Sequence, residues 1–108
     1  MAGRQFPPFT ASGTASASGA LTLTYTPRSN DLTRVTQVAA EMANAGGAIC
    51  VVRRNGALVT PLVPTGGAAG GDPPIWLWPG DALTVEWTGG PVSGVGKMTV
   101  FFDLGPWA

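Results

Sequence analysis

The chain has 108 residues, of which six are basic and six acidic, so its formal net charge is zero. This length allows one domain with one modest core, and the neutral balance gives no general attraction for nucleic acid or an anionic membrane. Only 11% of the residues are charged, against about 25% in average soluble domains, whereas 44% are hydrophobic. We therefore expect copies of the chain, or another protein, to cover part of its surface.

Residues 1–18 combine a Phe-Pro-Pro-Phe element with small polar residues and show no hydrophobic period. This composition predicts an extended N-terminal arm, in which Phe6 and Phe9 are the anchors on a neighbouring chain. No apolar segment approaches the ~18 residues of a transmembrane helix, and the first residues lack the apolar region of a signal peptide. We expect synthesis in a cytoplasm without membrane insertion, and a folded domain over residues 19–108.

The first regular pattern begins at residue 20, where Leu and Tyr alternate with Thr through residue 26. This alternation is typical of a half-buried strand. The next segment, residues 32–47, permits two interpretations, because residues such as Val35 and Val38 approximate helical spacing. Its many β-branched residues and a partial alternation favour a strand, which is the interpretation that we adopt.

The dipeptide Asn55-Gly56 separates two apolar segments, AICVVRR and ALVTPLV. Both residues tolerate the positive φ of a type I′ turn, so the sequence predicts a β-hairpin here. Pro61 donates no hydrogen bond to a sheet, which predicts that the second arm is an edge strand or is bulged. Cys50, the only cysteine, lies within the first apolar segment and is expected to be a buried, unreactive thiol.

Residues 64–74, PTGGAAGGDPP, are predicted to form a glycine-rich loop. Such loops can bind phosphate, but no lysine or helix start follows this one, so we expect no phosphate site. Three further strands are predicted over residues 75–78, 82–87 and 97–103. The chain as a whole then has about seven strands, which indicates an all-β, antiparallel β-sandwich or jelly-roll with the N-terminal arm attached.

Three of the four tryptophans lie within the segment PIWLWPGDALTVEW. Because side chains alternate along a strand, Trp76 and Trp78 share one face of it, and Ile75 and Leu77 share the other. We favour the arrangement that buries Ile75 and Leu77 and exposes the two indoles. The opposite arrangement stays open, because Trp is itself often mostly buried.

The strand at residues 82–87 is expected to pair with this segment as a hairpin. Glu86 must face outward, which places Trp87 on the inner face and in the core. Trp76 and Trp78 would then lie outside, on the same face as Glu86. Two adjacent indoles form an apolar patch that a monomer would not keep exposed, so we expect a protein neighbour to cover them.

No catalytic or cofactor-binding residues are predicted, because the chain has no His, no serine in a nucleophile-elbow setting and no motif of paired carboxylates. Asp72 and Asp81 lack the dense oxygen spacing of a calcium loop, and we expect no metal site. Asp81 follows Pro-Gly and is expected to cap a turn. The candidate site is therefore an interface. Its predicted residues are Phe6, Phe9, Trp76, Trp78 and Trp107.

The segment VVRRNGALVTPLVPTGGAAGGDPPIWLWPGDALTVEWTGG, followed by GKMTVFFD, resembles small virion proteins encoded among the structural genes of tailed phages that infect actinobacteria. The resemblance covers residues 20–103 and is carried by the NG turn, the GGDPP segment and the pattern LxPGDxLxV at residues 77–85. That pattern is also similar to a hairpin of trimeric jelly-roll domains.

The resemblance implies a non-enzymatic structural protein of a virion, in the tail or its tip, or alternatively a capsid decoration protein. Its implied partners are other virion proteins and copies of itself. A further alternative is a carbohydrate-binding module that contacts the host envelope, in which Trp76 and Trp78 would stack on a glycan.

Overall fold

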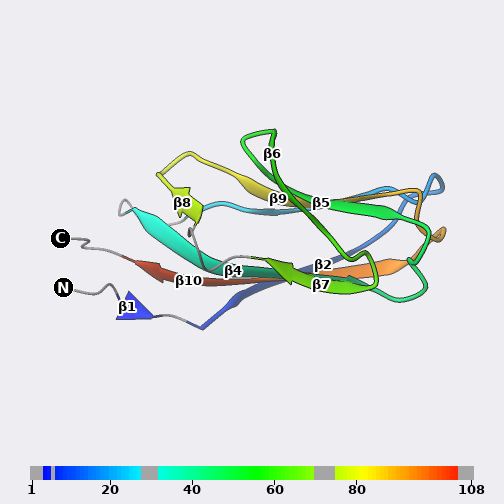
Figure 1. Ribbon diagram of the computed structural model, residues 1–108, viewed down its shortest axis with the longest axis horizontal. Coiled ribbons are helices and arrows are strands. Elements are labelled where there is room, and N and C mark those ends of the chain that lie inside the picture. Colours follow the sequence, from blue (N-terminus) through cyan, green and yellow to red (C-terminus); the bar gives the residue numbers. More distant parts are fainter. Residues whose placement is uncertain (1–3, 6, 28–31, 70–74, 105–108) are drawn as a thin grey trace.

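The computed structural model describes residues 4–5, 7–27, 32–69 and 75–104. Over these ranges the chain forms two packed antiparallel β-sheets (Figure 1), which confirms the predicted all-β sandwich. The described residues contain no helix, and hence none long and apolar enough to cross a membrane. They form ten strands instead of about seven, because three additional strands arise where the sequence shows no apolar alternation.

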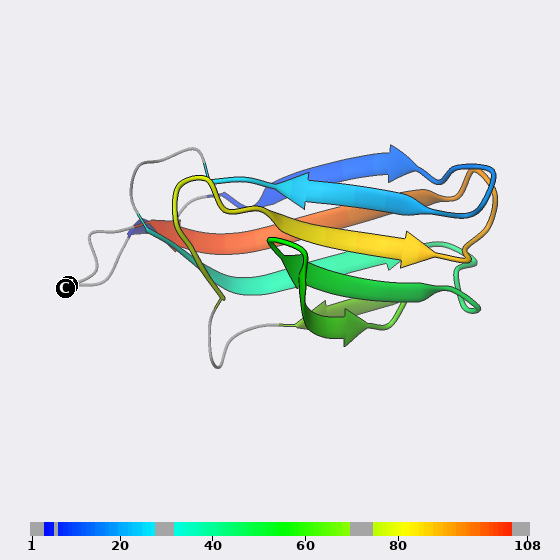
Figure 2. The ribbon, with the colours of Figure 1, turned by 90° about the horizontal axis from the view of Figure 1, so that it is seen from above.

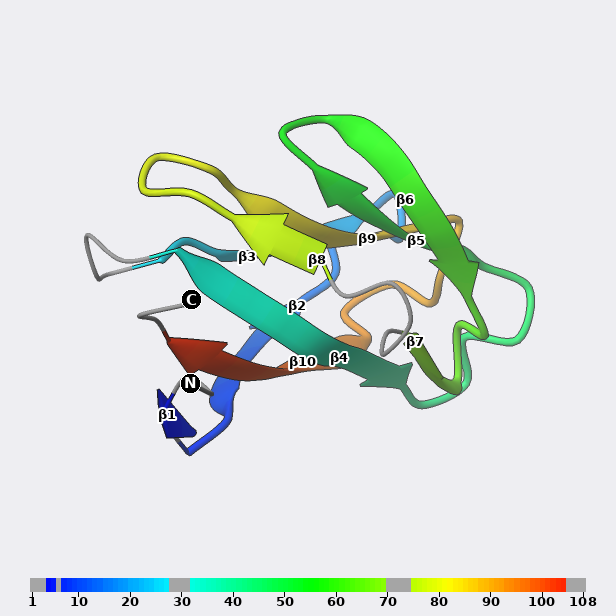
Figure 3. The ribbon, with the colours of Figure 1, turned by 60° about the vertical axis from the view of Figure 1, so that its left-hand side comes forward.

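The larger sheet has β10 and β4 at its centre, with the two N-terminal strands beside β10. On the other side of β4, β7 and β8 follow one another along its length (Figure 3). The strands of this sheet are β1 (Arg4–Gln5), β2 (Phe9–Thr14), β4 (Thr33–Met42), β7 (Gly66–Ala69), β8 (Ile75–Leu77) and β10 (Val95–Leu104).

The smaller sheet has four strands in the order β3-β9-β5-β6, which follow one another across the molecule in Figure 2. β9 and β5 are central, whereas β3 and β6 are edge strands. The bounds of these strands are β3 (Leu21–Tyr25), β5 (Ile49–Arg54), β6 (Ala57–Leu62) and β9 (Leu83–Thr88).

The core lies between the sheets, and Trp87 of β9 is its largest fully buried side chain. Its indole Nε1 donates a hydrogen bond to the Pro64 carbonyl oxygen at 3.2 Å, so burial leaves this polar group satisfied. Gly96 of β10 makes room for the ring, because a Cβ there would lie 2.5 Å from Leu21 Cδ2 and 3.2 Å from Trp87 Cη2. The predicted core position of Trp87 is confirmed.

The strand interpretation of residues 32–47 is confirmed by β4, which contains a β-bulge. Phe101 of β10 pairs with Gln37 and Phe102 pairs with Val35, which leaves Thr36 as the extra residue. The bulge shifts the alternation, so the buried residues Val35 and Val38 are three positions apart. This spacing is the physical reason why the segment has a helix-like pattern in the sequence.

The predicted hairpin is confirmed by β5 and β6, with φ values of 51° at Asn55 and 86° at Gly56. β6 is an edge strand, and its pairing with β5 also shifts by one residue, so both expectations for the Pro61 arm hold. Cys50 is buried in β5, and burial raises the pKa of its thiol to about 11. The thiol is therefore protonated at neutral pH, as expected of a structural cysteine.

Two predicted irregular segments contain strands. Within residues 1–18, β2 pairs with β10 over residues 9–14, so this part of the predicted arm is a strand of the sheet. Within the predicted glycine-rich loop, Gly66–Ala69 forms β7 and pairs with β4, which corrects the prediction of a continuous loop. Apart from Phe9, both strands have small side chains, so neither shows the apolar alternation that marks a strand in a sequence.

Candidate functional site

The tryptophan segment at β8 has the predicted inner and outer faces. Leu77 is buried, whereas Trp76 is 37% exposed and Trp78 is 58% exposed. The arrangement that buries the two indoles is therefore excluded. Trp78 is the more exposed of the two indoles at this end of the sandwich.

The predicted hairpin between residues 75–78 and 82–87 is wrong. β8 pairs with β4, where Trp76 lies opposite Arg34, whereas β9 lies in the smaller sheet between β3 and β5. The connection after β8 thus crosses from one sheet to the other (Figure 3). A Pro-Gly turn signals a reversal of the chain, but it does not show whether the next strand joins the same sheet or the facing one. The inward-facing side chains of β8 and β9 are the same in either case, so the burial pattern does not distinguish the two.

Three side chains fasten this connection to the β5–β6 turn, and we call them the polar latch: Arg54, Asn55 and Asp81. Arg54 donates from Nε to the Trp76 carbonyl oxygen and from Nη2 to Asp81 Oδ2, both at 3.0 Å. Asp81 Oδ2 accepts the Trp78 N–H at 2.9 Å, and the Asp81 N–H donates to the Trp78 carbonyl at 3.0 Å. The predicted turn cap at Asp81 is confirmed.

Asn55 completes the latch from the hairpin turn. Its Nδ2 donates to Asp81 Oδ1 at 3.0 Å, and it exchanges two hydrogen bonds of 2.8 Å with the backbone of Ala82. The hydrogen bond from Asn55 holds the pKa of Asp81 below its usual value, with further lowering from the Trp78 N–H and the charge of Arg54. The latch thus restricts the backbone that displays Trp76 and Trp78.

The buried carboxylate of Asp103 is paired with Arg34, the residue opposite Trp76. Asp103 and Arg34 lie opposite each other on β10 and β4, and Arg34 Nε donates to Asp103 Oδ2 at 3.2 Å. The Arg34 Nη2 group binds the same oxygen. Among the described residues, the carboxylates of Asp81 and Asp103 are thus both bound within the chain.

A second apolar surface, which the sequence analysis missed, lies on the outer side of β5 and β6. Ile49, Leu58 and Val63 are 65%, 59% and 60% exposed. We call this surface the β5–β6 face, and it consists of Ile49, Val51, Leu58, Pro61 and Val63. The sequence does contain a sign of this surface. A strand with one buried face needs an apolar residue only at every second position, but ALVTPLV is apolar at nearly every position, so some of its apolar side chains must lie on the outer face.

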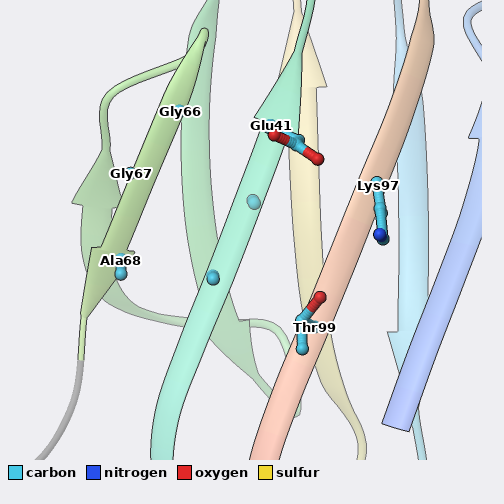
Figure 4. Close-up of a pocket in the computed structure, with 8 residues that line it drawn as sticks. Glu41, Gly66, Gly67, Ala68, Lys97 and Thr99 are labelled. Carbon is cyan, nitrogen blue, oxygen red and sulfur yellow. The ribbon is translucent and has the colours of Figure 1, made fainter. Parts of the chain in front are cut away.

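The outer side of the larger sheet has a shallow depression of about 460 Å³ over β7, β4 and β10 (Figure 4). Glu41 of β4 and Lys97 of β10 are a cross-strand pair at one end of it, and Thr99 lies further along β10. Its remaining lining consists of Ala39, Ala40, Gly66, Gly67 and Ala68. Short side chains explain the hollow, and we assign no ligand to it.

The other predicted interface residues fall into two groups. Phe9 is partly buried on β2, and its ring centroid lies 4.9 Å from that of Tyr25, so it packs within its own chain. This contact differs from the anchoring on a neighbour that the sequence suggests. Phe6 and Trp107 lie outside the described residues. Within the described ranges no group of three or more His, Cys, Asp or Glu residues could hold a metal ion.

Comparison of the chain with protein-family models, curated proteins and solved structures found no match. The chain is a small β-sandwich. It has exposed tryptophans at one end and exposed aliphatic side chains on the outer side of its smaller sheet.

Proposed function

We propose that this chain is a non-enzymatic structural protein of a phage virion, assembled in several copies in the tail or its tip. The observation that carries the proposal is the exposure of large apolar side chains in a protein with few charges. Trp78, Ile49, Leu58 and Val63 are each more than half exposed, and exposed apolar side chains that gather on one surface often mark a protein interaction site. Contacts with other virion proteins or with further copies would remove this surface from water.

The polar latch supports a binding role for the tryptophan segment. Hydrogen bonds from Arg54 and to Asp81 restrict the backbone on both sides of Leu77 before any partner arrives. A surface that is already ordered loses less conformational entropy on binding, which leaves more of the contact energy as affinity. Trp is also the residue most enriched among the energetic centres of protein interfaces.

A glycan is the second candidate partner, because Trp76 and Trp78 are 37% and 58% exposed and a pyranose can stack on an indole. Sugar recognition normally adds polar groups that converge on the hydroxyls. Among the described residues, the carboxylates of Asp81 and Asp103 are already bound by Arg54 and Arg34. We therefore favour a protein partner, and a glycan array probed with the natural chain and with Trp78→Ala tests the alternative.

The virion role is tested by locating the protein in intact particles by electron cryomicroscopy. Density in the tail is expected, and density on the capsid would instead support a decoration protein. Particles assembled with Trp78→Ala should incorporate less of the protein, whereas Val92→Ala, which removes a 66% exposed side chain from the β9–β10 connection, should incorporate normally. Particles that contain none of the protein would contradict the proposal.

A further inference from the structure

The Asn55-Gly56 pair has the sequence in which asparagine deamidates most readily. In this reaction the backbone nitrogen of the next residue attacks the side-chain carbonyl carbon, and ammonia leaves as a succinimide ring forms. Water then opens the ring to aspartate or isoaspartate. A following glycine hinders the attack least, because it has no side chain, and Asn55 is the only asparagine of the sequence that precedes a glycine.

Neither burial nor crowding protects this pair. Both residues are exposed, so the water that opens the ring can reach them. A Cβ placed on Gly56 would have no described atom within 4 Å, so the space beside the turn is open. Any protection against the reaction must therefore come from the conformation of the chain.

The backbone of the turn opposes ring closure. Closure requires the Gly56 nitrogen to lie on the same side of the Cα–C bond as the Asn55 Cβ. Asn55 has a φ of 51°, and the first central residue of a type I′ turn has a ψ of about +30°. This ψ places the next nitrogen nearly opposite Cβ. The turn must therefore change its conformation before Asn55 can react.

The polar latch holds the side chain of Asn55 as well. Its Nδ2 donates to Asp81 Oδ1 at 3.0 Å, and its Oδ1 accepts the Ala82 N–H at 2.8 Å. The Asn55 N–H also donates to the Ala82 carbonyl oxygen at 2.8 Å. Both ends of the carboxamide are thus bound to a distant segment of the chain. Rotation of the Asn55 Cγ toward Gly56 breaks both side-chain hydrogen bonds.

The products of the reaction cannot restore these contacts. Aspartate at position 55 has no side-chain N–H to donate, and its negative charge repels that of Asp81. Isoaspartate adds a methylene group to the main chain, which changes the geometry of the two-residue turn. Because the ammonia is lost, the change is permanent, and it adds one negative charge to a chain whose net charge is zero.

We propose that Asn55 is a deamidation site that the type I′ turn and the polar latch keep closed, and that its reaction permanently loosens the connection after β8. The rate is set by the fraction of time for which the turn and the latch are open together. This modification is a property of the chain itself and does not depend on its role in a virion.

Peptide mapping by mass spectrometry measures the rate in the purified full chain, incubated in mildly alkaline buffer. The peptide RRNGAL, which lacks the latch, is the unprotected reference. The natural chain should deamidate at Asn55 at least about tenfold more slowly than this peptide. Asp81→Ala should react at least about fivefold faster than the natural chain, which is equivalent to about 1 kcal/mol, the net contribution of one hydrogen bond. Glu41→Ala, which removes an exposed carboxylate from the larger sheet, is the matched control and should react at the natural rate.

The loosening is measured by amide hydrogen exchange in the deamidated chain, which its added charge separates from the natural chain. The Ala82 N–H, which Asn55 Oδ1 accepts, should exchange at least about fivefold faster after deamidation. The N–H of Val85, in β9 between its two partner strands, should not change.

Equal rates in the natural chain and the peptide would overturn the proposal, as would equal rates in the natural chain and Asp81→Ala. Unchanged exchange at Ala82 would overturn the predicted loosening and with it the proposal. Thermal unfolding checks that each variant is folded. Should Asp81→Ala be unfolded, Arg54→Gln, which removes the ion pair with Asp81, takes its place, with RQNGAL as its reference peptide.

Discussion

Replacement of Trp87 by Ala should remove a large part of the stability of the domain. The ring is fully buried between the sheets and donates a hydrogen bond to Pro64. Truncation of a buried Trp to Ala typically costs about 3–5 kcal/mol, and loss of the hydrogen bond adds about 1 kcal/mol. Domains of this size are stable by about 5–15 kcal/mol, so a loss of about 4–6 kcal/mol leaves the variant marginally folded or unfolded at 25 °C if the natural chain lies in the lower half of that range.

Urea unfolding followed by far-ultraviolet circular dichroism measures this loss without relying on tryptophan fluorescence. Trp87→Phe should retain most of the packing and cost about 1–3 kcal/mol. Trp78→Ala, at an indole that is 58% exposed, should change the free energy of unfolding by less than about 1 kcal/mol. If Trp78→Ala proved as destabilising as Trp87→Ala, the assignment of core and surface indoles would be wrong.

Four smaller predictions follow from single groups. The Thr33 hydroxyl is buried with no hydrogen-bond partner among the described residues, so Thr33→Val should raise the unfolding free energy by about 1 kcal/mol in urea titrations. Gly56→Val, at a φ of 86°, should lower the melting temperature by several degrees, whereas Gly46→Val, where a Cβ has open space and φ is not positive, should not. Because hydrogen bonds hold the pKa of Asp81 below 3.8, its contribution to stability is complete above that pH and is lost as the pH falls through the lowered value. The stability gap between the natural chain and Asp81→Asn should therefore shrink between pH 7 and strong acid. Cys50, with a pKa of about 11, should react with thiol reagents at the rate of global unfolding, and rapid labelling in native buffer would contradict its burial.

Local features of the fold could be read from the sequence because they depend on neighbouring residues. The Asn55-Gly56 turn requires only two residues with positive φ, and the structure has both. β4 was harder, because its bulge shifts Val35 and Val38 away from a two-residue period. Such a shift depends on the partner strand, which lies about sixty residues further along the chain.

The remaining features of the fold are not predictable from the sequence, because they depend on long-range strand pairing or on strands with small side chains. The inner face of β8 was evident from Leu77, but its pairing with β4 is set by contacts between distant segments. β2 and β7 contain mostly small residues, and their position follows from pairing with β10 and β4, not from their own composition. For the surface, the exposure of Trp76 and Trp78 was predictable, whereas the β5–β6 face required knowing which side of β6 the core occupies.

The latch gives position 55 two requirements that few amino acids meet together. The residue must accept a φ of 51°, and its side chain must both donate to Asp81 and accept from Ala82. Glycine meets the first requirement but has no side chain, and aspartate would bring a second carboxylate against Asp81. Asparagine is therefore the residue that evolution should retain there. Its persistence at this point, one residue before glycine, offers a way to recognise distant relatives after the rest of the surface has diverged.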